Sequence, residues 1–198
     1  MLVTRVTLTN LSHTLFARTI YKRGTFVEVY SYDYIPQSVL FGALAFATNR
    51  VLKKPLSIVD KIHLTSAPPR CGCGKDTFFQ EPEKPVCDEH GYVTVSHSML
   101  VHSVPLDPYC WQPKMISFKG EFTEHRRMSP RKFYALTPDQ EFSFLTYVED
   151  EESRDVFMEA LRVLCSEVND EKGIGLGIGW GKKFWGLFKA KTTGWGSL

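Results

Sequence analysis

The stretch that decides the fold is YDYIPQSVLFGALAFATNRVL, residues 32–52. Pro36 stands where a helix begins, because a proline in the first turn removes no hydrogen bond that the helix needs. Apolar residues then recur at helical spacing until Lys53, Lys54 and Pro55, which end the pattern. Because the stretch is mostly apolar, the sequence predicts that this helix is buried.

Alternating segments before and after this helix indicate strands. Residues 2–11, LVTRVTLTNL, predict a first strand, and residues 24–32, GTFVEVYSY, predict an extended hairpin arm. Later segments predict, in order, strands at 115–125 and 141–150, a helix at 151–168 and a last strand at 183–191. The order strand, helix, insertion, strand, strand, helix, strand is typical of an α+β, ferredoxin-like (RRM-like) sandwich, and we expect one such domain over residues 1–198.

Composition limits the class of protein. The chain has 198 residues and 43% hydrophobic content, which is enough for a substantial core. No apolar run approaches the roughly 18 residues of a membrane span, and residues 1–5 begin a strand-like alternation instead of a signal peptide. We therefore expect a cytoplasmic protein without membrane contact. Five cysteines, an odd number, indicate free thiols or a metal site and not a disulfide framework.

Residues 65–113 interrupt the regular pattern and form a predicted insertion, with seven of the eleven prolines and four of the five cysteines. Thiolate and imidazole are ligands of tetrahedral zinc, and a loop-rich segment of this size has little else to order it. The predicted zinc ligands are Cys71, Cys73, Cys87 and His90, with Cys110, His97 or His102 as possible replacements and unligated, reduced thiols as the alternative. Four protein ligands leave no open position for a reacting water, so the expected zinc is structural.

Charge is unevenly distributed although the formal net charge is only +2. Residues 114–134 hold six lysines and arginines against two acids, residues 139–171 hold eleven acids, and residues 172–191 hold five lysines and no acid. The acidic segment is typical of the solvated face of a helix. The two basic segments fit either a solvated surface or contact with a polyanion.

A glycine-rich stretch, GIGLGIGWGKKFWG at residues 173–186, follows the second predicted helix. Its six glycines indicate a sharp bend or a close approach to another molecule. An RNA strand suits such a loop, with Lys182 and Lys183 on phosphates and Trp180 or Trp185 stacked on a base. The alternative is a tight turn packed inside the domain. The start of the first helix, at residues 36–38, offers backbone N–H groups as a second place for a phosphate.

Four stretches of the sequence carry a family resemblance. DYIPQSVLFGALAFA, residues 33–47, resembles the YIPGS-x-x-x-GALA helix start of the RAMP superfamily of CRISPR-associated proteins, and the glycine-rich stretch resembles the C-terminal glycine-rich loop of that superfamily. Residues 124–150 and the cysteine-rich segment after SAPP resemble the crRNA 5′-handle-binding group of type III effector complexes. Gln37 stands where the family usually has glycine, and the chain is shorter than typical type III members, which often carry two ferredoxin-like halves.

The resemblance implies a non-catalytic subunit that binds the 5′ handle of crRNA and caps one end of a type III-like effector ribonucleoprotein. Expected partners are the crRNA, a backbone RAMP subunit and a large subunit. The expected RNA-binding residues are Pro36, Gln37, Ser38, His125, Arg126, Arg127, Arg131, Gly175, Gly177, Gly179, Trp180, Lys182 and Lys183.

The sequence is also compatible with two other functions. The first is a metal-independent endoribonuclease that processes CRISPR repeat RNA, in which His13 with His125, Arg126 or Arg127 would supply a general base and a cation. The second is a protein-only scaffold without RNA contact. Cleavage of repeat RNA separates the endoribonuclease from the 5′-handle-binding subunit, and salt-dependent RNA binding separates both from the scaffold.

Overall fold

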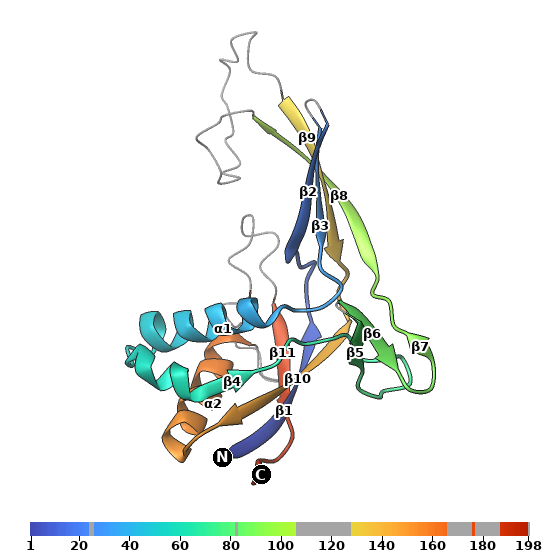
Figure 1. Cartoon of the computed structure of the whole chain (residues 1–198). Coiled ribbons are helices and arrows are strands. Elements are labelled where there is room, and N and C mark those ends of the chain that lie inside the picture. Colours follow the sequence, from blue (N-terminus) through green and yellow to red (C-terminus); the bar gives the residue numbers. More distant parts are fainter. Residues whose placement is uncertain (24–25, 82, 106–127, 166–175, 177–186, 198) are drawn as a thin grey trace.

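The computed structural model describes residues 1–23, 26–81, 83–105, 128–165, 176 and 187–197 (Figure 1). The helices are α1 (Gln37–Phe46) and α2 (Glu151–Leu164), and α1 is followed by a π-helical turn (Ala47–Val51) and a 3₁₀ helix (Leu56–Lys61). The strands are β1 (Leu2–Asn10), β2 (Ala17–Arg23), β3 (Phe26–Ser31), β4 (Ile62–Leu64), β5 (Phe78–Glu81), β6 (Lys84–Cys87), β7 (Gly91–Tyr92), β8 (His97–Pro105), β9 (Met128–Leu136), β10 (Glu141–Val148), β11 (Phe188–Thr192) and β12 (Gly196–Ser197).

The main sheet has the strand order β11-β1-β10-β4, and neighbouring strands are antiparallel. The chain runs through β1, α1, β4, β10, α2 and β11 to build it, which is the βαββαβ connection of a ferredoxin-like domain. The predicted α+β, ferredoxin-like class is therefore confirmed. The apolar faces of α1 and α2 meet this sheet, and the core includes Leu8, Leu44, Phe144, Phe157 and Phe188.

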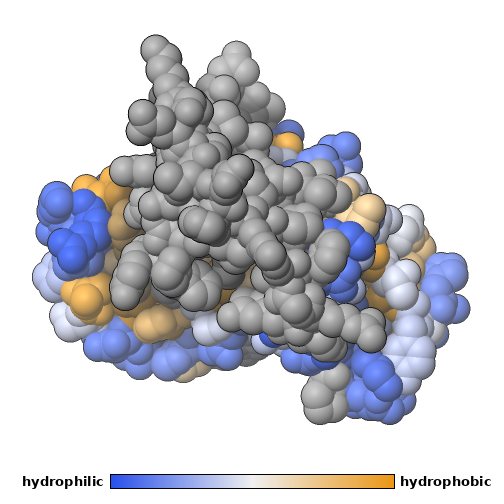
Figure 2. Space-filling model, turned by 90° about the horizontal axis from the view of Figure 1, so that it is seen from above, coloured by the Kyte–Doolittle hydropathy of each residue, from blue (hydrophilic) through white to orange (hydrophobic). Residues whose placement is uncertain are grey.

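Helix α1 begins as predicted but is only partly buried. Pro36 is its N-cap residue, and the helical path continues through the π-helical turn to residue 51. Leu40, Ala43 and Leu44 are buried, whereas Phe41 and Phe46 keep 39% and 41% of their surface exposed. The prediction of a wholly buried helix is thus wrong for one face. Figure 2 shows hydrophobic surface on the side of the molecule that α1 occupies.

A second sheet is built from two segments that lie far apart in the sequence. The β2–β3 hairpin lies between β1 and α1, and β8 and β9 lie between β4 and β10. Strand β3 pairs with β9 in parallel, so the order is β2-β3-β9-β8 (Figure 1). The extended arm predicted at residues 24–32 is confirmed by β3, whereas its partner β2 was not expected.

The second strand position of the ferredoxin-like sheet is filled by β4, only three residues long. The strand predicted at 115–125 lies outside the described residues. The chain between β4 and β10 carries β5 to β9, and β5, β6 and β7 form a small antiparallel sheet of their own. Within the described ranges, no helix is long and apolar enough to cross a membrane.

Candidate metal centre and its surroundings

Two tight turns carry the four predicted zinc ligands. In the first, the Gly74 N–H donates to the carbonyl of Cys71 over 2.8 Å and the Cys71 N–H donates to the carbonyl of Lys75 over 3.0 Å. Gly74 has a φ of +81°, a conformation that side chains with a Cβ rarely adopt. The turn holds Cys71 and Cys73 side by side at its surface.

The second turn joins β6 to β7. Cys87 ends β6 and pairs with Gly91, the first residue of β7, whose φ is +71°. His90 directly precedes this glycine. The turn therefore returns the chain so that the imidazole of His90 faces the thiol of Cys87, at 3.8 Å from Nδ1 to Sγ.

The four side chains have the spacing of tetrahedral zinc ligands. Their ligand atoms all lie within 4.8 Å of one another, with 3.9 Å between Cys73 Sγ and Cys87 Sγ and 3.5 Å between Cys71 Sγ and His90 Nδ1. Zn–S and Zn–N bonds of about 2.3 and 2.1 Å place two ligand atoms of a tetrahedron roughly 3.6–3.8 Å apart. A disulfide would need about 2.05 Å between the sulfurs. The cluster is suited to zinc.

The surroundings of Cys87 lower the pKa of its thiol and so favour the thiolate form. The hydrogen bond with His90 contributes most to lowering the pKa of Cys87 to about 6, and the hydrogen bond from the backbone N–H of Glu89 contributes next. Burial of the thiol acts in the opposite direction. A thiolate is the form that binds metal. By contrast, burial raises the pKa of Cys165, the fourth described cysteine, to about 12.

The first turn is fixed to the main sheet through Asp76. Its carboxylate lies 2.6 Å from Arg5 Nη1 on β1, 3.2 Å from Arg70 Nε, and accepts a hydrogen bond of 2.8 Å from Ser143 Oγ on β10. Arg70 also pairs with Glu141 over 2.8 Å. The candidate metal centre is thus attached to the two central strands of the ferredoxin-like sheet.

The replacement ligands lie elsewhere or are not described. His97 pairs with Asp33, with 3.4 Å between Nε2 and Oδ1, at a cleft in the second sheet. His102 has its backbone in β8, paired with Arg131, and Cys110 lies outside the described residues. The set first predicted from the sequence is the one that the fold brings together.

The start of α1 offers less to a phosphate than the sequence indicated. The N–H of Gln37 donates to Ser66 Oγ over 3.1 Å, and the N–H groups of Val39 and Leu40 donate to the carbonyl of Pro36. Gln37 and Ser38 are exposed. Three of the first N–H groups of the helix therefore already have acceptors.

Most of the other predicted RNA-binding residues lie outside the described residues. They are His125, Arg126, Arg127, Gly175, Gly177, Gly179, Trp180, Lys182 and Lys183. Of Arg131 the backbone is described, in β9 opposite Val27 of β3. Leu176, in the middle of the glycine-rich stretch, is described: it is 5% exposed and belongs to the main core.

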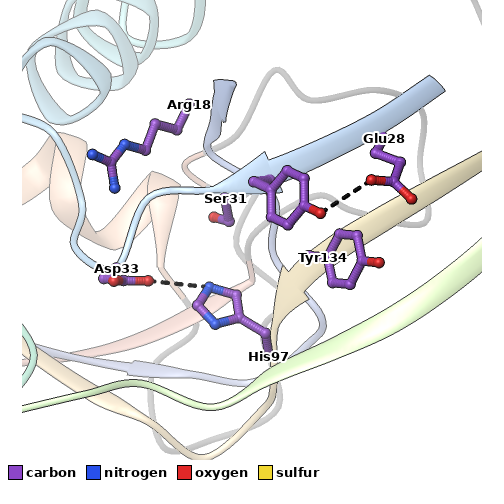
Figure 3. Close-up of a pocket in the computed structure, with 7 residues that line it drawn as sticks. Arg18, Glu28, Ser31, Asp33, His97 and Tyr134 are labelled. Carbon is purple, nitrogen blue, oxygen red and sulfur yellow. Dashed lines mark hydrogen bonds and ion pairs between the residues drawn. The ribbon is translucent and has the colours of Figure 1, made fainter. Parts of the chain in front are cut away.

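A cleft in the second sheet was not predicted from the sequence. It is lined by Arg18, Glu28, Tyr30, Ser31, Asp33, His97 and Tyr134 (Figure 3). These residues come from the four strands β2, β3, β8 and β9 and from the loop after β3, and the longest sequence separation among them exceeds 100 residues. No local motif joins them, so only the pairing of β3 with β9 reveals the site.

Comparison with known proteins gives a similarity of fold. No family model matches the sequence, and no curated protein matches it. A chain of the type III-B Cmr-beta complex bound to cognate target RNA is similar, with a TM-score of 0.55 and 14% identity over 96% of this chain. The present chain spans only 58% of the length of that chain. A chain of a type IV-B CRISPR complex aligns over 96% of this chain and 89% of its own length, with a TM-score of 0.46 and 8% identity.

Proposed function

We propose that this chain is a non-catalytic, RNA-binding subunit of a type III-like CRISPR effector ribonucleoprotein. In this proposal it binds the 5′ handle of crRNA and caps one end of the complex, beside a backbone RAMP subunit and a large subunit. The similarity in fold to a chain of an RNA-bound type III-B complex supports the proposal, as do the two family motifs at residues 33–47 and 173–186.

One observation carries the proposal furthest. Leu176 is buried in the core and lines a hollow of about 20 Å³ together with Leu40 and Leu44 of α1. Leu176, in the middle of the glycine-rich stretch, therefore lies beside α1, although the two motifs are more than 120 residues apart in the sequence. A loop that binds RNA near the start of α1 requires such a neighbour position for its own residues.

We also propose that the Cys71, Cys73, Cys87 and His90 cluster binds one structural zinc ion. All four positions of a tetrahedral ion would be taken by protein ligands. The role of the metal would be to order the small β5-β6-β7 sheet, not to take part in a reaction.

The proposal is tested by RNA binding of the full chain across salt concentrations. The probe is a labelled single-stranded RNA that carries the repeat-derived handle of the CRISPR array nearest the gene. The chain should bind it more weakly as salt rises, and Lys182→Ala with Lys183→Ala should reduce the slope of log affinity against log salt by about one to two. Lys189→Ala with Lys191→Ala is the matched control, since both lysines are exposed on β11 in the same basic segment.

Two outcomes would contradict the proposal. Absence of salt-dependent binding would favour a protein-only scaffold. An equal loss of slope in both double variants would assign the salt dependence to general basic charge and remove the glycine-rich stretch from the RNA-binding surface.

A further inference from the structure

The second sheet carries an open cleft of about 830 Å³, a volume typical of small-ligand sites (Figure 3). Both insertions of the ferredoxin-like domain contribute to it: Glu28 and Tyr30 come from β3, Tyr134 from β9 and His97 from the start of β8. The metal cluster uses none of these residues. The cleft therefore needs an explanation of its own.

Two tyrosines form the aromatic part of the cleft. Tyr30 and Tyr134 are register partners on β3 and β9, and their rings stack with centroids 4.3 Å apart and planes 4° apart. The alternate residues Val29 and Phe133 are buried on the opposite face of the sheet. Both tyrosines are half-buried and line the cleft, so part of this aromatic surface is open to a ligand.

Carboxylates lie on both sides of this pair. Tyr30 donates to Glu28 Oε2 over 3.1 Å, and Asp33 Oδ1 lies 3.4 Å from His97 Nε2. Lys132 is 3.4 Å from Glu28 Oε1 and partly balances its charge. Partial burial and hydrogen bonds with Tyr134 and Glu28 raise the pKa of Tyr30 to about 12, so its hydroxyl remains a donor at neutral pH.

The charges of the cleft restrict the chemistry of a ligand. Arg18 also lines the cleft, but its guanidinium group is paired with Glu83. The carboxylates repel a phosphate at short range, but they accept hydrogen bonds from N–H groups. Aromatic side chains stack on unpaired bases, which have a flat π-face. A nucleobase with N–H donors on its Watson–Crick edge satisfies both parts of the cleft, with its phosphates left outside.

We propose that the cleft binds one unpaired nucleobase of an RNA strand, stacked on the Tyr30–Tyr134 pair and read by the carboxylate of Glu28 or Asp33. Guanine fits best, because its adjacent imino and amino N–H groups match the two oxygens of one carboxylate. Uracil fits least, because its single N–H lies between two carbonyl oxygens that a carboxylate repels. This inference rests on the proposed RNA-binding function.

The test uses four labelled five-nucleotide RNAs that are all uridine except for the central base, which is G, A, C or U. The full chain should bind the G oligonucleotide most tightly and the all-U oligonucleotide least tightly. Tyr134→Leu should weaken binding of the G oligonucleotide about 5- to 100-fold, the range for loss of one stacked base. Tyr134→Phe is the matched control and should bind like the wild type, because it keeps the ring.

Selectivity is measured separately from stacking. Glu28→Gln or Asp33→Asn should reduce the preference for G over U while each variant keeps the thermal stability of the wild type. Retention of that preference in both variants, or wild-type affinity in a folded Tyr134→Leu variant, would overturn the inference. If the wild type binds the handle RNA but these variants do not change its base preference, the site is wrong and the proposed function stands; if the wild type binds no RNA, both fail.

Discussion

Single residues in this chain act through partners that the sequence does not place beside them. Asp150 belongs to an acidic segment that is typical of a solvated helix face, yet it is the N-cap of α2. It accepts hydrogen bonds of 2.8 Å from the Ser153 N–H and 2.8 Å from Lys61 Nζ. The hydrogen bond from Lys61, and to a smaller extent those from Ser153, hold the pKa of Asp150 well below its usual range. The charge therefore anchors α2 to the chain just before β4.

Asp150→Ala is expected to lower the melting temperature by about 2–4 °C, because the N–H of Ser153 loses its acceptor. Asp150→Asn is the matched control, since asparagine keeps the cap and removes the charge.

The charge of Asp150 also makes stability depend on pH. Because folding lowers the pKa of the Asp150 carboxyl group, its charge stabilises the fold above about pH 4, and this contribution is lost as the pH falls toward the folded-state pKa. Thermal unfolding across pH should thus show the gap between wild type and Asp150→Asn narrowing in acid. A constant gap would contradict this role.

The metal cluster could be predicted from its residues in the sequence, whereas the cleft in the second sheet could not. Cys71, Cys73, Cys87 and His90 lie within 20 residues of sequence, and zinc ligands have recognisable types and spacing, so the set could be predicted. Tyr30 and Tyr134 look like ordinary strand residues in isolation. Their stacking follows from a parallel pairing across more than 100 residues, which local periodicity does not encode.

The same distinction holds for whole elements. β1, β10 and α2 are long and strongly periodic, so their type and position could be predicted. β4 is three residues long and offers too few positions for a pattern. β8 lies in a segment whose prolines and cysteines indicated loop. The small β5-β6-β7 sheet could not be predicted from hydrophobic patterning, because it has little apolar core of its own.

Because the β5-β6-β7 sheet has little apolar core, we expect a bound zinc ion to stabilise it. Between residues 71 and 92 the described buried side chains are few, and one of them, Cys87, is itself a candidate ligand. Protein purified without chelator should contain about one zinc per chain. Cys87→Ala should lose the metal and make residues 71–92 sensitive to limited proteolysis, because the two turns lose their common anchor.

Cys165→Ala is the matched control for the zinc experiment. Cys165 is buried in the main core and far from the cluster in sequence, so its loss should cost stability without changing zinc content. Elemental analysis of both variants and the wild type decides the matter. Less than about a tenth of a zinc per wild-type chain would rule out the structural metal.

At the scale of the whole molecule, the two longest connections of a ferredoxin-like domain merge into one structure. The β1–α1 connection supplies β2 and β3, the β4–β10 connection supplies β8 and β9, and the β3–β9 pairing joins them. Such long-range pairing closes large loops and is entropically unfavourable, so it requires compensating contacts. The buried cluster of Leu15, Val29, Phe133 and Ala135 provides them. The proposed base-binding cleft lies on the other face of this second sheet, and it would give the second sheet a function.

The whole chain is expected to bind repeat RNA without cutting it. A metal-independent ribonuclease needs a free general base near a cation, and three of the described histidines have other partners: His63 lies 3.8 Å from Glu149, His90 belongs to the metal cluster and His97 pairs with Asp33. The measurement is a denaturing gel of end-labelled repeat RNA, incubated with the full chain in the presence and absence of chelator. Specific cleavage that persists with chelator, is abolished by His13→Ala or His125→Ala and survives in the control His63→Ala would instead make the chain a processing endoribonuclease.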